Sequence, residues 1–195
     1  MKRIASIISF VTLVILFSNC SIGYSQNSFE LSFQSRLILE GTSTIHDWEM
    51  ISTNASGSAI ITLENEQITD ISKLIINMPV ETLKSGKLAM DKNAYKALNS
   101  NKYPSITFEL IEVVSITDRL IKSKGMLAIA GNKKAVSVEV KYNITTDTIQ
   151  FTGAIPISFT QFEIDPPKAL FGTIKTGDDL EISFETSFIS KPKKI

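Results

Sequence analysis

Residues 136–144 read VSVEVKYNI, and this stretch decides the fold class. Apolar side chains stand at every second position and alternate with serine, glutamate, lysine and asparagine. Because successive side chains of a β-strand point to opposite faces, this alternation predicts a strand with one apolar face. Residues 149–159 (IQFTGAIPISF) repeat the pattern after the turn signal Thr146-Asp147. The two stretches therefore predict neighbouring strands that bury their apolar faces together.

The same period-two alternation recurs on both sides of this pair. The further strand candidates are residues 29–33, 45–51, 55–63, 71–79, 106–110, 120–130 and 180–188. The alternation fades near Val113. Turn signals at Thr117-Asp118, Gly131-Asn132 and Gly177-Asp178-Asp179 separate several of the segments. The chain is therefore expected to be all-β over most of its length.

Two segments break the alternation. Residues 90–101 (MDKNAYKALNSN) carry apolar side chains at helical spacing, which predicts a short helix. Asp91 is expected to cap its first turn, and Tyr103-Pro104 to end it. Residues 165–176, which begin with Asp-Pro-Pro, are expected to form a long loop between the last strands.

Eight or nine strands with one apolar face each bury those faces either in a sandwich or in a closed barrel. Strands of ten or more residues with short hairpins favour an antiparallel up-and-down β-barrel of about eight strands, with one short helix. An eight-stranded barrel is just wide enough for a small apolar ligand. The inverted alternative, an outer-membrane barrel, fits less well because the polar faces carry lysine and glutamate.

Residues 1–25 have the pattern of a secretory signal peptide, which predicts an exported protein. A basic start, Lys2 and Arg3, precedes the apolar residues 4–17 (IASIISFVTLVILF) and then small polar residues. Cleavage before Gln26 is one expectation, and a lipoprotein signal of residues 1–19 with lipidation at Cys20 is the alternative. The remaining domain, 26–195, is expected to be periplasmic or secreted, or else an outer-membrane-anchored lipoprotein.

The charge and cysteine content limit the function further. The chain has 20 Lys plus Arg and 20 Asp plus Glu, and loss of Lys2 and Arg3 would make it slightly acidic. This composition argues against a nucleic-acid partner, which requires clustered positive charge. Cys20 is the only cysteine, so the domain cannot use disulfides and must gain its stability from its core.

Three short motifs of this chain match the pattern of one known family. The most specific runs from Met90-Asp91-Lys92 through Ala97-Leu98 to residues 102–108 (KYPSITF). The other two are residues 41–48 (GTSTIHDW) and 127–134 (LAIAGNKK), in which Lys133 stands where threonine is usual. Through these motifs the chain resembles the YceI-like family, in the form found in exported Bacteroidetes-type members, over roughly residues 29–189.

The resemblance implies a lipocalin-like barrel that holds a long polyisoprenoid or quinone-type lipid, with no other cofactor. It also implies a homodimer, and a lipid ligand implies a peripheral encounter with a membrane. The function expected is therefore non-catalytic binding or carriage of such a lipid. The candidate ligand-binding residues are the apolar ones expected to face inward: Phe108, Leu110, Val138, Val140, Phe151, Ile155, Leu180, Ile182 and Phe184. The alternative is that they fill the barrel as core, which would make it a structural or interaction protein.

His46-Asp47-Trp48 is the one constellation that suggests chemistry. His46 is the only histidine, and neighbours on a strand point to opposite faces, so Asp47 is not expected to orient it. No second histidine is available for a metal site. We expect Trp48 to pack in the core, and His46 and Asp47 to form hydrogen bonds near the barrel rim. Contact of these residues with a lipid headgroup is the first alternative. Catalysis on a lipid-borne group is the less favoured alternative.

Overall fold

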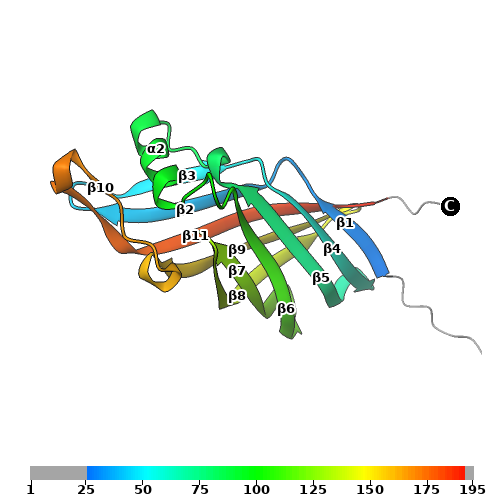
Figure 1. The fold of residues 1–195 in the computed structure, drawn as a ribbon. Helices are drawn as coiled ribbons and strands as arrows, with labels where there is room; N and C mark the ends of the chain where they lie inside the picture. The colour runs from blue at the N-terminus through cyan, green and yellow to red at the C-terminus, as the bar shows by residue number, and fades with distance from the viewer. Residues whose placement is uncertain (1–25, 192–195) are drawn as a thin grey trace, which may run out of the picture.

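The computed structural model describes residues 26–191 as a β-barrel with one α-helix (Figure 1). The elements in chain order are β1 (Gln26–Leu31), β2 (Arg36–Ser43), β3 (Trp48–Ser52), β4 (Ser56–Glu64), β5 (Gln67–Pro79), η1 (Val80–Thr82), α2 (Leu88–Ala97), β6 (Ser105–Thr117), β7 (Leu120–Ile129), β8 (Asn132–Ile144), β9 (Thr148–Ser158), η2 (Thr160–Phe162), β10 (Lys168–Ala169), η3 (Leu170–Gly172) and β11 (Ile174–Ser190). The predicted signal peptide and Cys20 lie outside the described residues.

Eight antiparallel strands close the barrel. Their order is β1-β4-β5-β6-β7-β8-β9-β11, and pairing of β11 with β1, for example Phe29 with Ser190, completes the circle. From β4 to β9 every strand pairs with the next strand in the chain. The predicted antiparallel up-and-down barrel of about eight strands is confirmed.

Strand β11 is longer than the barrel and extends its wall at one end. Its last residues pair with β1, whereas residues 176–185 pair with β2, which in turn pairs with β3. The β2–β3 hairpin therefore projects beyond the closed barrel, next to α2 and β10 (Figure 1). Strand β2 was not among the strand candidates, because Leu37-Ile38-Leu39 is a continuous apolar run without alternation.

β-Bulges explain two irregularities in the sequence pattern, one in β6 and one in β11. The alternation fades near Val113 because β6 is irregular there, with register shifts between Leu110 and Glu112 and between Val113 and Ser115. The turn predicted at residues 177–179 is wrong, since this segment lies inside β11, where the register shifts between Thr176 and Leu180. Each bulge inserts residues without ending the strand.

The helix forms close to where it was predicted, but Asp91 does not cap it. The residue before the helix is Lys87, and Asp91 lies buried one turn inside α2. Its carboxylate accepts hydrogen bonds from the Ser85 backbone N–H (2.8 Å) and hydroxyl (2.7 Å). Burial alone raises the pKa of Asp91, but the Ser85 bonds and the charge of Lys84 together lower it further than burial raises it. Asp91 therefore ties α2 to the preceding loop.

Tyr95 makes a second tie between α2 and that loop. Its hydroxyl contacts the Leu83 carbonyl oxygen at 2.7 Å and accepts a hydrogen bond from Lys84 Nζ at 2.6 Å. This hydrogen bond raises the pKa of Lys84. With Asp91 and Tyr95 both bound to residues 83–85, α2 is held across one end of the barrel.

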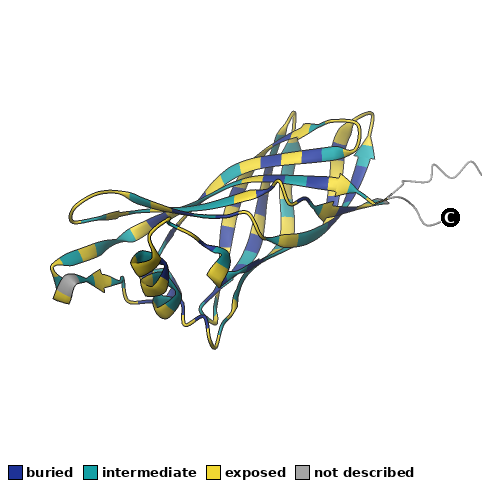
Figure 2. Cartoon of the chain, turned by 90° about the horizontal axis from the view of Figure 1, so that it is seen from above, coloured by how far each residue is buried: buried dark blue, intermediate teal, exposed yellow. Residues whose placement is uncertain are grey.

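Buried and exposed positions alternate along the barrel strands (Figure 2). At the end away from α2 the core is dense and includes Phe29, Ile149 and Phe188, each 2% exposed or less. The Phe151 and Phe188 rings meet edge to face with centroids 5.7 Å apart. Aromatic packing therefore closes this end of the barrel.

Candidate functional site

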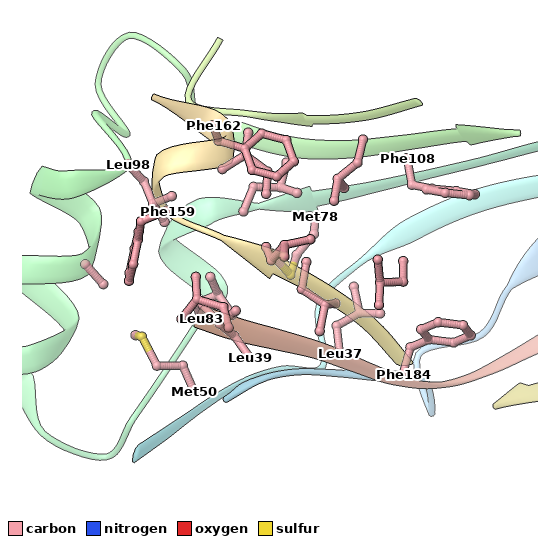
Figure 3. Close-up of a pocket in the computed structure, with 18 of the residues that line it drawn as sticks. Leu37, Leu39, Met50, Met78, Leu83, Leu98, Phe108, Phe159, Phe162 and Phe184 are labelled. Carbon is pink, nitrogen blue, oxygen red and sulfur yellow. The ribbon is translucent and has the colours of Figure 1, made fainter. Parts of the chain in front are cut away.

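The barrel encloses a cavity of about 480 Å³ that extends from the aromatic core to the α2 end (Figure 3). This volume falls in the range of small-molecule sites. Its floor is formed by side chains such as Ile121 and Phe188, and Lys87 and Lys168 lie at the opposite end. We call that end, beside α2, the β2–β3 turn and β10, the mouth.

All nine inward-facing candidates from the sequence line this cavity. Their roles differ with depth. Phe151 is buried in the closed end, where it forms part of the floor. Val138, Ile155 and Leu180 belong to the core cluster nearer the mouth. Phe108, Leu110, Val140, Ile182 and Phe184 are only partly buried, so their side chains retain surface facing the lumen.

Further lining residues were not among the nine candidates from the sequence. They are contributed by β2, β3, β5, the segment around α2 and the η2 turn (Figure 3): Leu37, Leu39, Met50, Met78, Leu83, Leu98, Phe159 and Phe162. Leu37 and Leu39 are two residues apart, as expected for two side chains on the inward face of a strand. The apolar Ile38 between them hides the alternation in the sequence. The residues near α2 carry no such signal, because only the tertiary fold brings the helix over the lumen.

Three glycines keep aromatic side chains flat against the wall. A Cβ added at Gly125 would lie 2.1 Å from Phe108 Cζ, and one at Gly41 would lie 2.4 Å from Trp48 Cζ2. At Gly153 the added atom would lie 2.6 Å from Phe184 Cζ. Each ring occupies the space that a side chain would otherwise fill on the adjacent strand. Because each glycine has no side chain, the ring packs directly against the neighbouring strand and takes up less of the lumen.

The few hydroxyl groups deep in the lumen are already satisfied. The Ser123 hydroxyl donates to the Val138 carbonyl oxygen and the Thr186 hydroxyl to that of Phe151, both at 3.4 Å. Among the described residues no buried side-chain nitrogen or oxygen lacks a partner. The deep lumen therefore presents hydrocarbon to a ligand and offers it no free polar group.

Polar and charged lining residues collect at the mouth. Lys87 and Asn93 come from the α2 segment, Lys168 from β10, and Ser43 and His46 from the β2–β3 turn. The residues that line the cavity include no aspartate or glutamate. A ligand with an apolar tail and a polar end would therefore place its polar end here, where hydrogen-bond donors predominate.

The residues His46, Asp47 and Trp48 do not converge. His46 and Trp48 line the cavity, whereas Asp47 lies in a shallow depression on the outer surface together with Glu40 and Glu49. His46 Nδ1 lies 2.7 Å from the backbone oxygen of Asp47, not from its carboxylate. Trp48 Nε1 donates to the Thr42 carbonyl oxygen at 2.9 Å, which fixes the indole at the lumen wall.

Fold and cavity together define a lipocalin-like barrel with a cavity inside it. The chain belongs to the YceI-like domain family, whose model matches residues 29–188. The resemblance seen in the sequence motifs is thereby confirmed. None of the curated proteins compared matches the chain. Within residues 26–191 no helix is long and apolar enough to cross a membrane.

Solved structures share this fold at low sequence identity. BcnA of Burkholderia cenocepacia is 15% identical with a TM-score of 0.68, and the match covers 80% of this chain and 98% of BcnA. A polyisoprenoid-binding domain of Saccharophagus degradans, implicated in plant cell wall breakdown, is 10% identical with a TM-score of 0.63, covering 86% and 100%. A Campylobacter jejuni YceI protein is 18% identical with a TM-score of 0.57, covering 70% and 82%.

Proposed function

We propose that this protein is an exported, non-catalytic carrier of a long-chain polyisoprenoid or a similar lipid, which it holds inside the barrel. The observation that carries the proposal is the cavity of about 480 Å³, whose deep hydroxyl groups are already hydrogen-bonded and whose charged side chains lie at its mouth. A long hydrocarbon tail would lie in the deep lumen, and its polar end would meet Lys87, His46 or Lys168. The description of the S. degradans domain as polyisoprenoid-binding supports the same class of ligand.

Apolar contact supplies the affinity in this proposal. Burial of hydrocarbon contributes about 25 cal/mol per Å² of apolar surface, or about 0.8 kcal/mol per CH₂ group. A branched polyisoprenoid chain offers many such groups, so tight binding needs almost no polar contact. The rings laid against Gly125 and Gly153 provide flat surfaces for such a chain.

The alternative of a filled structural barrel predicts no cavity of several hundred Å³. The open volume and the partly buried Phe108 and Phe184 favour a ligand-binding barrel over a filled one. No described feature favours a different class of ligand over a lipid.

The direct test is to identify what the protein carries in its own host. The chain is purified from that host without detergent, and its solvent extract and the intact protein are both examined by mass spectrometry. We expect an isoprenoid lipid in near-stoichiometric amount. Protein from its own host that is reproducibly empty, or that carries only compact polar molecules, would overturn the proposal.

A further inference from the structure

Three large apolar side chains are exposed around the mouth of the barrel. Ile45 in the β2–β3 turn is 61% exposed, Leu88 at the start of α2 is 78% exposed, and Phe171 between β10 and β11 is fully exposed. They belong to three segments that are distant in sequence but meet at one end of the molecule (Figure 1). Each segment also lines the cavity, through Ile45 itself, Lys87 and Lys168. The three side chains therefore surround the opening.

Phe171 is fully exposed and lies in a turn with an unfavourable backbone conformation. Its φ and ψ angles of 55° and 31° are left-handed, a conformation that is unfavourable for a residue with a side chain. Gly172, with a φ of 87°, continues the turn. Exposed turns usually carry polar residues, but Phe171 is the most exposed large apolar side chain among the described residues. An aromatic ring in this position points to an apolar partner beyond the protein.

The same three segments are rich in positive charge, although the whole chain has a formal charge of zero. Residues 42–48, 84–93 and 165–176 contain five lysines: Lys84, Lys87, Lys92, Lys168 and Lys175. Their exposed carboxylates are Asp47 and Asp165, because Asp91 is buried and bonded to Ser85. Cations surrounding exposed apolar side chains are the combination that binds anionic lipid surfaces.

We propose that this rim, formed by Ile45, Leu88, Phe171 and the five lysines, docks the mouth of the barrel onto an anionic membrane surface. The purpose of docking rests on the proposed lipid cargo, since a lipid that passes from bilayer to lumen through the docked mouth exposes less hydrocarbon to water. Insertion of the three apolar side chains into the interface supplies affinity, and the lysines supply selectivity for anionic lipid. The docked state also aligns the lumen with the acyl chains.

The test measures binding to vesicles by co-sedimentation, using residues 26–195, which contain the whole barrel, in every variant so that neither the apolar signal segment nor an acyl anchor at Cys20 contributes. Vesicles of equal parts phosphatidylglycerol and phosphatidylcholine are compared with vesicles of phosphatidylcholine alone. We expect binding to the anionic vesicles that high salt weakens. The double variant Leu88→Ser/Phe171→Ser should lose at least tenfold in partition coefficient. Lys87→Gln and Lys168→Gln should each lose about fivefold on anionic vesicles.

Phe33→Ser is the matched control. Phe33 is 82% exposed, but it lies in the β1–β2 turn beside Ser187, toward the closed end of the barrel. Its replacement should leave vesicle binding unchanged. Equal losses in Phe33→Ser and in the rim variant, or no binding of the parent chain to anionic vesicles, would overturn the proposal. So would a dimer that Phe171→Ser dissociates in size-exclusion chromatography, because the rim would then bind a second copy.

Vesicle binding and cargo are read out separately. If extracts of the host-purified protein contain isoprenoid lipid but the rim does not bind vesicles, the docking proposal fails and the carrier function stands. If the rim binds vesicles but the protein carries no lipid, the carrier function fails and docking stands.

Discussion

Replacing Gly125 with alanine tests whether the glycine-backed aromatic rings keep the lumen open. The added Cβ would lie 2.1 Å from Phe108 Cζ and 2.2 Å from Cε2, whereas ordinary contacts are 3.4–4 Å. The ring must therefore move by more than 1 Å. The nearest backbone atom, the Glu109 carbonyl oxygen, would be 3.1 Å away, which demands only a small adjustment. Since the strand blocks the other side, the ring moves into the lumen.

The size of the effect follows from the hydrocarbon that the ring displaces. Exclusion of one or two CH₂ groups of a ligand costs about 0.8 kcal/mol each, which corresponds to roughly a four- to fifteenfold loss of affinity. The stability of the empty protein should fall less than the 1–3 kcal/mol typical of overpacked cores, because the ring has free volume to enter. The expected signature is weaker binding with little change in unfolding.

Trp48 provides the assay. It is the only tryptophan, and it lines the cavity, so its fluorescence reports occupation of the lumen. Geranylgeraniol is titrated into delipidated parent protein and into Gly125→Ala, and urea unfolding of both is measured without ligand. A change in binding that parallels a large change in unfolding would indicate general damage to the barrel.

The double variant Gly125→Ala/Phe108→Leu decides the mechanism. Leucine is smaller than the ring and no longer overlaps the added methyl group, so the double variant should recover most of the lost affinity relative to Phe108→Leu alone. The reasoning is refuted if Gly125→Ala binds the probe as tightly as the parent, or if its loss persists unchanged in the Phe108→Leu background.

The other predictions concern His46 at the mouth, Asp91 in the helix and a second glycine. His46→Ala should leave the identity and amount of bound lipid unchanged, whereas a chemically altered lipid in extracts of that variant would revive the enzyme alternative. Asp91→Ala should cost about 1–3 kcal/mol of unfolding free energy at neutral pH, because the Ser85 N–H loses its acceptor. Folding lowers the pKa of Asp91 below its ordinary value of 3.8. The stabilisation by the Asp91 carboxylate is therefore complete above pH 3.8 and is lost as the pH falls through the lowered pKa. The urea midpoints of Asp91→Ala and of the parent should accordingly converge in acid. Gly153→Ala should lower the melting temperature by more than Gly125→Ala does, because its Cβ would lie 2.7 Å from the Glu139 carbonyl oxygen, a backbone atom that cannot rotate away.

The alternation of apolar and polar residues predicted most barrel strands and which of their side chains face inward. The prediction failed where the backbone departs from a regular pleat. The bulges of β6 and the register shift at residues 177–179 of β11 interrupt the period of two without ending the strand. The helix was found from its spacing, but its first turn was misplaced because Asp91 binds the loop before the helix rather than the helix N-terminus. The sequence shows an aspartate in either case, so it does not distinguish a residue that caps a helix from one that binds the preceding loop.

The sequence by itself determined the all-β barrel and the inward side of most of its walls, because side-chain direction on a strand is a local property with a period of two. It also indicated the YceI-like family through residues 102–108. Whether inward residues such as Phe108 fill the barrel or line a space was decided only by the tertiary structure. That outcome depends on Gly125 of β7 lying diagonally across from Phe108 of the adjacent strand β6, and on α2 lying over the mouth. The volume left between packed side chains is a property of several strands together, which no single stretch of the chain encodes.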